Sequence, residues 1–229
     1  MGQLALPLRL ADHAVFASFL SSGNESLVAE LQSIAEGTGS GCWLWGAAAS
    51  GKTHLLQAVC ELAGDRSVYI PMSTFAPAGP AIVEGLESRE LLCIDDLEAI
   101  AGDGDWEHAL FALWNRLHDS GGQLVVAAAM ASRECPFGLP DLKSRLNMLP
   151  VYQLHLLDED RRVDALQLRA RHRGLELPAE TARFMLNRSR RDMASLYRLL
   201  DKLDLEALRA KRRLTIPFVS SVLRDSGAS

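Results

Sequence analysis

One segment of the chain carries the residue types that proteins use to hold a polyphosphate. It reads Gly46, Ala47, Ala48, Ala49, Ser50, Gly51, Lys52 and Thr53, and it completes the pattern G-x-x-x-x-G-K-[ST]. An apolar run over 42–45 precedes it and a helical pattern opens at its end, which is the context that this motif requires. We expect backbone N–H groups and the helix N-terminus to bind phosphate oxygens. Lys52 would then reach the β- and γ-phosphates of ADP or ATP, Thr53 would bind Mg²⁺, and His54 would adjoin the nucleotide.

A pair of carboxylates follows another apolar run, 91–94, and adds a metal function to the same site. A buried acidic residue at the end of a strand is costly unless it meets a cation. We therefore assign Asp95 to the magnesium shell and Asp96 to the orientation of an attacking water. Capping of the next helix is the alternative role for Asp96. Many ATPases have a longer glutamate at that point, so the shorter aspartate predicts slow hydrolysis.

Two arginines are candidates for a further contact with nucleotide. Arg145 lies in the segment 138–146 on a short predicted helix, and Arg191 lies in the segment 189–193 at the start of a long one. Taken alone, either arginine is more typical of a solvated helix surface, and only the combination with the P-loop, the acidic strand end and a helical lid points to the nucleotide. The run 123–129 has no polar side chain near its end, which again predicts weak intrinsic hydrolysis.

The elements that must position these residues alternate along the first two thirds of the chain. Apolar strands at 42–45, 67–70, 91–94, 123–129 and 152–154 alternate with helical patterns at 52–62, 81–86 and 105–120. Strands of this kind indicate a parallel sheet covered on both faces. From 158 onward the patterns at 158–173, 178–187, 192–210 and 216–224 are all helical. We predict an α/β P-loop domain at 11–155 with a parallel five-stranded sheet between helices, then a small all-helical lid domain at 156–229. Residues 1–10 form an extended tail.

Composition limits the remaining possibilities. The chain is 48% hydrophobic, contains no apolar run long enough to cross a membrane and opens on no export signal, so we expect a cytoplasmic protein without a membrane partner. Its four cysteines, Cys42, Cys60, Cys93 and Cys135, form no C-x-x-C pair, which favours reduced, buried thiols. The net charge is −10 over 1–150 and +5 over 151–229. This asymmetry suits head-to-tail packing in a homo-oligomer or contact of the second half with phosphates, although a solvated helical surface gives the same pattern.

Beyond these motifs, the sequence resembles the AAA+ ATPases of the DnaA type, and most of all the DnaA-related regulators of chromosome replication initiation. The resemblance covers nearly the whole length and is strongest over 138–146, 165–171 and 213–219. It implies that Arg145 is an arginine finger for a nucleotide held by a neighbouring subunit and that Arg191 is the sensor-2 arginine of the lid. It also implies that three residues of the N-terminal segment lie near the adenine: Phe16, Phe19 and Asn24.

The tail extends the resemblance to a partner. Gln3, Leu4, Leu6, Pro7 and Leu8 resemble the motif by which these regulators bind the DNA polymerase sliding clamp, whereas a frayed terminus is the alternative. The sequence lacks the helix-turn-helix domain of DnaA after the lid, so we expect no sequence-specific DNA binding by this chain alone.

Two hypotheses about function follow. In the first, the chain binds ADP or ATP, docks on the clamp and presents Arg145 to the ATP of DnaA, which promotes its hydrolysis. In the second, it is a self-assembling AAA+ ATPase or a helicase-loader-like protein whose own Lys52, Asp95 and Asp96 turn over ATP. A P-loop kinase would need an acceptor site, and the sequence indicates none.

Overall fold

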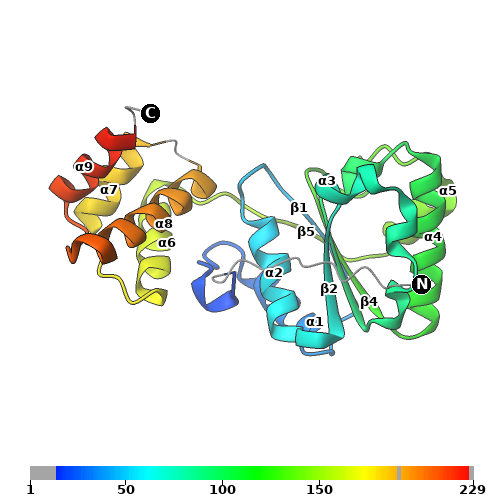
Figure 1. The fold of residues 1–229 in the computed structure, drawn as a ribbon. Coiled ribbons are helices and arrows are strands. Elements are labelled where there is room, and N and C mark those ends of the chain that lie inside the picture. The colour runs from blue at the N-terminus through cyan, green and yellow to red at the C-terminus, as the bar shows by residue number, and fades with distance from the viewer. Residues whose placement is uncertain (1–13, 190–191, 227–229) are drawn as a thin grey trace. The chain divides into compact units, whose positions relative to one another are not determined.

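Five short strands form a parallel sheet in the order β2-β3-β4-β1-β5, which Figure 1 shows at the centre of the first part of the chain. The computed structural model describes residues 14–189 and 192–226. The strands are β1 (Cys42–Trp45), β2 (Ser67–Pro71), β3 (Leu91–Asp95), β4 (Gln123–Ala128) and β5 (Val151–Gln153). Because all five run in parallel, the chain segments that follow β1, β3 and β4 emerge at one edge of the sheet.

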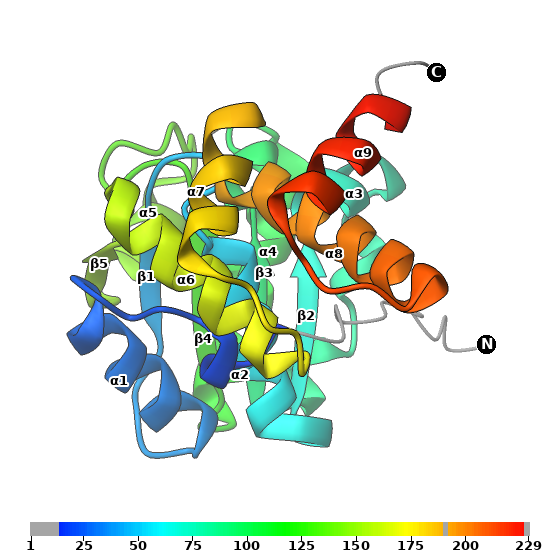
Figure 2. The same ribbon diagram turned by 90° about the vertical axis from the view of Figure 1, so that its left-hand side faces the viewer.

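Helices cover both faces of this sheet, as expected for apolar parallel strands. On one face α1 (Glu25–Ala35) packs against α2 (Lys52–Ala63), which contacts β2, β3 and β4. On the other face α4 (Gly104–Asp119) packs against β4 and against α5 (Pro140–Leu146). Figure 2 shows the strands of this sheet next to one another, in the order given above. The helices thus anchor both the glycine-bounded loop, which leads into α2, and the segment that carries Arg145.

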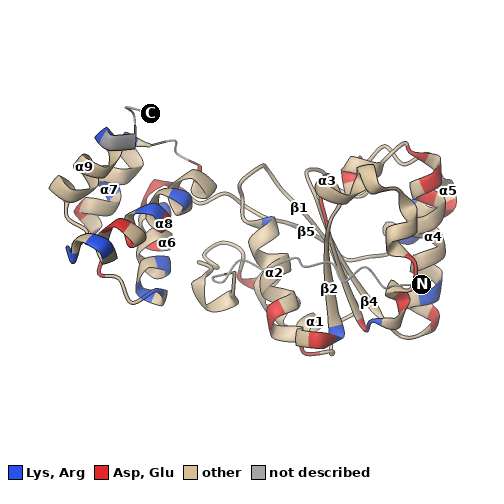
Figure 3. Ribbon diagram, in the orientation of Figure 1, with Lys and Arg blue, Asp and Glu red and all other residues tan. Residues whose placement is uncertain are grey.

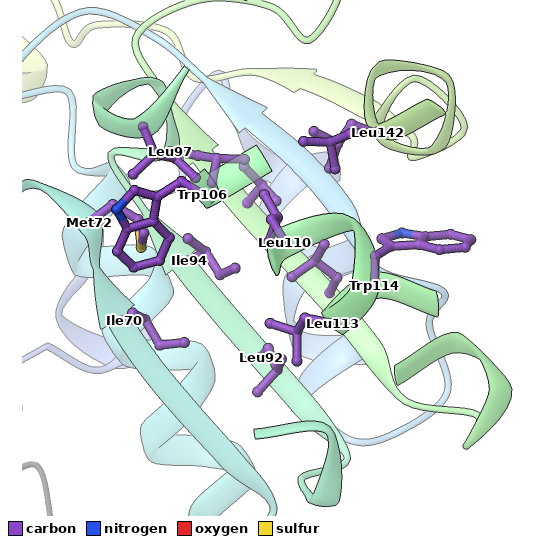
Figure 4. Packing of buried hydrophobic residues seen from close by; sticks show 14 of the residues in the cluster. Ile70, Met72, Leu92, Ile94, Leu97, Trp106, Leu110, Leu113, Trp114 and Leu142 are labelled. Carbon is purple, nitrogen blue, oxygen red and sulfur yellow. The ribbon is translucent and has the colours of Figure 1, made fainter. Parts of the chain in front are cut away.

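A hydrophobic core of the α/β domain lies between the sheet and α4. Every third or fourth residue of α4 faces inward, which follows from the helical repeat. Figure 4 shows these side chains packed with those of β2, β3 and α5 and with Met72 and Leu97, which follow β2 and β3. The labelled side chains are Ile70, Met72, Leu92, Ile94, Leu97, Trp106, Leu110, Leu113, Trp114 and Leu142. Burial of aliphatic and aromatic side chains on this scale fixes the relative positions of α4 and α5.

The segment between β2 and β3 differs from the sequence prediction. The expected helix over 81–86 is absent, and short turns take its place: α3 (Met72–Phe75), η3 (Ala76–Ala78), η4 (Pro80–Val83) and η5 (Leu86–Ser88). Two glycines with positive φ, Gly79 at +83° and Gly85 at +82°, divide these turns. Left-handed residues interrupt an α-helix, and the apolar spacing alone did not reveal them. Three further 3₁₀ turns are η1 (Phe16–Ser18), η2 (Gly64–Arg66) and η6 (Leu97–Ile100).

A helical unit makes up the rest of the chain. It comprises Leu156–Ser229 together with the short segments Ala17–Gly23 and Ala49–Gly51. Its helices are α6 (Glu159–His172), α7 (Ala179–Arg188), α8 (Met193–Ala210) and α9 (Ile216–Ser226). Asp158 and Asp192 cap α6 and α8 through their carboxylates, as side chains of this type do at helix starts. Apolar side chains of all four helices form a core of their own, with Leu166, Leu186, Leu196 and Val219 buried in it.

The basic charge of the second half lies on these helices. Figure 3 marks Lys and Arg residues along the ribbon of α6 and α8. Arg169 lies over the ring of Tyr197 at 4.3 Å from its centroid, and Arg173 binds Asp201 at 2.6 Å between Nη2 and Oδ1. Part of the positive charge of this helical unit is therefore engaged in contacts within the unit itself.

These features confirm the predicted fold class, a parallel five-stranded α/β domain followed by an all-helical domain. The four cysteines are buried free thiols, also as predicted. Within the described residues, none of the helices combines the length and the apolar character that crossing a bilayer requires.

The entry to β1 offers a direct test of the packing. Gly41 has a φ of +86° and lies against the backbone of Leu124, so a Cβ atom there would overlap the Leu124 carbonyl oxygen. Gly85 has a similar φ of +82°, but a Cβ atom there would meet nothing within 4 Å. We expect Gly41→Ala to lower the free energy of unfolding by roughly 3 kcal/mol, from backbone strain plus overlap, and Gly85→Ala by only about 1 kcal/mol. Chemical denaturation measures both, and equal losses would contradict the predicted overlap.

Candidate nucleotide-binding site

The glycine-bounded loop connects β1 to α2 at the carboxyl edge of the sheet. Its first residue is held in place because the Gly46 N–H donates to the Ala128 carbonyl at the end of β4, at 3.3 Å. Later in the loop Ala49 and Gly51 have φ values of +60° and +109°. A Cβ atom at position 51 would come within 2.9 Å of Cε2 of Phe19. The second glycine of the motif is therefore required both by its backbone angle and by a neighbouring ring.

The lysine of the motif is buried and turned onto its own loop. Nζ of Lys52 donates to the carbonyl oxygens of Gly46 at 2.7 Å and Ala47 at 3.1 Å, and its side chain forms no ion pair within the described residues. A buried ammonium group without a carboxylate partner is costly. Anionic phosphate would supply the missing charge in place of the two carbonyls.

A second polar group in the loop also fits phosphate. Oγ of Ser50 is buried and has no hydrogen-bond partner. An orphaned buried hydroxyl carries a free-energy cost that a bound acceptor removes. Together with Lys52, this hydroxyl makes the loop suitable for a polyphosphate. The residues present therefore fit the group that the sequence motif implies.

Three side chains from three elements meet at the end of β3. The carboxylate of Asp95 is 1% exposed, and its Oδ2 accepts hydrogen bonds from Thr53 Oγ1 at 2.7 Å and Tyr69 OH at 2.9 Å. Its Oδ1 accepts from the Asp96 N–H at 3.1 Å. Burial raises the pKa of Asp95, although the donated hydrogen bonds act in the opposite direction. A magnesium ion bound by Thr53 and Asp95 would favour the ionised carboxylate that burial disfavours.

Sequence reasoning did not find Tyr69, the second donor to Asp95. Tyr69 pairs with Cys93 in the register of β2 and β3, so its side chain lies on the same face of the sheet as Cys93 and Asp95, which are two residues apart. Burial, followed by the charge of Asp95, raises the pKa of Tyr69 and keeps the phenol a donor. A polar ring in an apolar strand was the only signal, and local patterns do not reveal the register.

Asp96 lies in a left-handed conformation, with φ +54° and ψ +43°, directly after the strand. It precedes η6 without capping it through its side chain. Oδ2 of Asp96 instead accepts a hydrogen bond from Ser73 Oγ of α3 at 2.7 Å. A non-glycine residue in this region is strained, a feature that gathers at functional sites. Asp96 thus occupies the N-cap position of η6 through its backbone alone. Its role toward water stays a prediction.

A carboxylate that the sequence analysis did not identify lies at the end of β4. Oε1 of Glu98, on η6, accepts a hydrogen bond from the Ala129 N–H at 3.0 Å. The strand itself is apolar, as predicted. The acidic group comes from a different element, which a search along the strand could not reveal.

The remaining predicted nucleotide contacts have other partners in this structure. His54 Nε2 lies 3.0 Å from the Val15 carbonyl oxygen. Asn24 forms a reciprocal pair with the backbone of His155: Nδ2 donates to its carbonyl at 3.3 Å and Oδ1 accepts from its N–H at 2.8 Å. Phe16 and Phe19 are half-buried near the start of the described chain. Proximity of these residues to adenine stays a prediction.

Arg145 lies in the last turn of α5 and is half-buried. Its guanidinium carbon is 5.0 Å from the centroid of the Trp114 ring, a cation–π contact. Across the residues that the structure describes, Arg145 has no carboxylate partner within 4.0 Å. Arg191 and the tail residues Gln3, Leu4, Leu6, Pro7 and Leu8 lie outside the described residues.

Comparisons with known proteins find one matching family model and several solved structures with a similar fold. Residues 158–223 match the family model described as Hda, lid domain. Domain III of the Thermotoga maritima replication initiation protein DnaA is similar with a TM-score of 0.74 and 23% identity, over 95% of this chain and 98% of that one. AMPPCP-bound DnaA from Aquifex aeolicus gives a TM-score of 0.72 at 20% identity, over 96% and 71% of the two chains.

A third solved structure also has a similar fold. The Thermotoga maritima RuvB Holliday junction branch migration motor is similar with a TM-score of 0.59 and 15% identity, over 90% of this chain and 69% of that one. Identities this low establish the shared AAA+ fold and no more. The family-model match over residues 158–223 connects the C-terminal helices with the lid domain of Hda.

The buried carboxylate gives a prediction with a defined sign. Because the pKa of Asp95 is raised above its ordinary value of 3.8, the folded state binds more protons than the unfolded state above that pH, and stability falls as pH rises through the folded pKa. We expect Asp95→Asn to raise the thermal midpoint at pH 7 without nucleotide or metal, and to abolish most of the stabilisation by Mg²⁺-ADP. That stabilisation is about 2.7 kcal/mol at a ligand concentration of 100 Kd.

Tyr69→Phe is the matched control for Asp95→Asn. It removes one donor and leaves the charge, so it should lower the midpoint of the ligand-free protein. A lower midpoint for Asp95→Asn under the same conditions would show that the ionised carboxylate costs the fold nothing.

Proposed function

Since this chain is a DnaA- and Hda-like AAA+ protein, we propose that it is a nucleotide-binding regulator of DNA replication initiation that promotes hydrolysis of ATP bound to DnaA. ADP or ATP binds at the loop 46–53, and Mg²⁺ binds at Thr53 and Asp95. The bound metal neutralises charge on the phosphates. Lys52 and the orphaned hydroxyl of Ser50 support this part of the proposal. Nucleotide analogues bound to DnaA structures of the same fold support it further.

One observation carries the regulatory part of the proposal. The guanidinium of Arg145 is held over Trp114, is half-buried and has no acidic partner among the described residues. A charge that is ordered but not neutralised within its own chain is available to an anion supplied by another molecule. An arginine contributed in this way stabilises the charge that develops on a transferred phosphoryl group. We propose that this group is the γ-phosphate of the ATP held by DnaA.

The proposal includes a second partner, the sliding clamp, which the N-terminal tail would bind. Gln3 to Leu8 would dock in an apolar groove of the DNA polymerase sliding clamp as an extended peptide, with Leu6 and Leu8 as anchors. Docking raises the local concentration of Arg145 near DNA-bound DnaA, an effect that needs no additional contact. The clamp therefore restricts the activity to replicated DNA.

Substitution of Arg145 tests the regulatory part directly. We expect Arg145→Ala to lower the maximal stimulation of DnaA ATP hydrolysis on clamp-loaded DNA by on the order of 10³, because the transition-state charge loses its cation. Nucleotide binding and clamp binding by the variant stay normal. Lys143→Ala, which removes a cation two residues earlier on the same helix, serves as the control and retains stimulation. Undiminished stimulation by Arg145→Ala would refute the proposal.

A self-assembling ATPase with its own turnover is the second candidate, and the assembled set of Lys52, Thr53 and Asp95 favours it. The regulatory proposal predicts that the purified chain hydrolyses ATP only slowly, on the order of 10⁻³ s⁻¹, as P-loop proteins without a positioned arginine do. Phosphate release by the isolated protein measures this rate, with Lys52→Ala as the background. A Lys52-dependent rate near 1 s⁻¹ would favour the second candidate.

A further inference from the structure

A buried carboxylate on α4 has three backbone partners and belongs to neither of the sites described above. The side chain of Glu107 is 1% exposed. Oε1 accepts hydrogen bonds from the Gly102 N–H at 2.7 Å and the Gly138 N–H at 3.0 Å, and Oε2 accepts from the Leu139 N–H at 2.6 Å. Burial alone would raise the pKa of Glu107, but these N–H groups lower it below its ordinary value. Glu107 is therefore an ionised buried group that three N–H groups stabilise.

Two of these contacts lie at the start of α5, the helix that carries Arg145. This helix spans Pro140–Leu146, and its N-cap residue, Leu139, has no side chain that can accept a hydrogen bond. A helix this short is marginal without tertiary contacts, and its first N–H groups need acceptors. Glu107 supplies the acceptor from another element and adds a negative charge at the N-terminal end of the helix dipole. The sequence of α5 alone provides neither.

The other end of α5 contacts the same face of α4. Trp114 follows Glu107 by two helical turns and so lies on the same side of α4. Trp114 is 8% exposed, and its ring lies 5.0 Å from the guanidinium carbon of Arg145 and stacks on His118 at 4.7 Å. Between the two contacts, Leu142 is buried in the same hydrophobic cluster as Leu110, and Figure 4 labels both side chains. One face of α4 thus holds both the start of α5 and its arginine.

We propose that Glu107 and Trp114 are positioning residues that fix the guanidinium of Arg145 in the orientation in which it meets the ATP of the partner. This inference rests on the function proposed above for Arg145. An arginine side chain has many rotamers, and ordering it before the encounter leaves less entropy to lose in the transition state. Glu107 sets the direction of α5, and the indole of Trp114 selects the rotamer of Arg145 at its end.

Substitutions at Glu107 and Trp114 distinguish the effect of orienting Arg145 from the effect of its presence. In Glu107→Gln the amide N–H₂ faces the Leu139 N–H, so the acceptor at the start of α5 is lost while the shape is kept. Trp114→Leu removes the aromatic face, and Trp114→Phe restores it. We expect Glu107→Gln and Trp114→Leu each to lower the maximal stimulated rate of DnaA ATP hydrolysis by roughly 10- to 100-fold, the effect of a small misplacement of a catalytic group. Trp114→Phe retains most of the rate.

Three further tests exclude a merely structural effect. The concentration of this chain that gives half-maximal stimulation should stay the same in all three variants, because docking is not altered. Leu113→Ala, which shortens a buried side chain next to Trp114, destabilises the fold but should leave the maximal rate per folded molecule unchanged. In an Arg145→Ala background, neither Glu107→Gln nor Trp114→Leu should lower the rate further, because the group that they position is absent.

The outcomes for this inference and for the proposed function are distinct. Arg145→Ala could remove stimulation while Glu107→Gln and Trp114→Leu keep the full maximal rate. In that case the positioning role of Glu107 and Trp114 is wrong, and the role proposed for Arg145 is supported. If the variants lose rate equally with and without Arg145, their effect does not pass through the arginine, and the positioning role is again wrong. Full stimulation by Arg145→Ala overturns both.

Discussion

The hydrogen bonds that converge on Asp95 organise the carboxyl edge of the sheet. A carboxylate that is 1% exposed at the end of an apolar strand is tolerated only with donors, and Thr53 and Tyr69 supply them from α2 and β2. This contact brings the end of the glycine-bounded loop to β3 and defines where a cation would bind. Since β3 lies beside β4 in the sheet, the loop, the acidic strand end and the apolar strand end share one edge.

The face of the sheet that α4 covers has a different role. There, α4 packs on the strands with one stripe and presents Glu107 and Trp114 to α5. Its own first residues are capped by Asp103, so the helix is well defined where Glu107 lies. A cation on a short helix is thereby fixed by a long helix that the core holds firmly. In this account the sheet edge binds the chain's own nucleotide, and α5 serves the nucleotide of another protein.

Much of this arrangement could be predicted from local patterns. The motif at 46–53 and the strand before Asp95 have short-range signals, because apolar runs and glycine spacing are properties of neighbouring residues. Tyr69, Glu98 and Glu107 could not be found in this way, because each acts on an element distant in the sequence. Their roles depend on strand register and on how α4 meets α5, which only tertiary packing determines. The turns at 80–88 were missed because Gly79 and Gly85 override a helical apolar spacing.

The central claim is that hydrolysis takes place in the partner's site. A single-turnover experiment tests it most directly: γ-labelled ATP is loaded on DnaA alone, this chain is filled with unlabelled ADP, and labelled phosphate release is followed on clamp-loaded DNA. The account predicts rapid release of label that depends on this chain although its own site holds only ADP. Release that occurs only when the label is carried by this chain would contradict it.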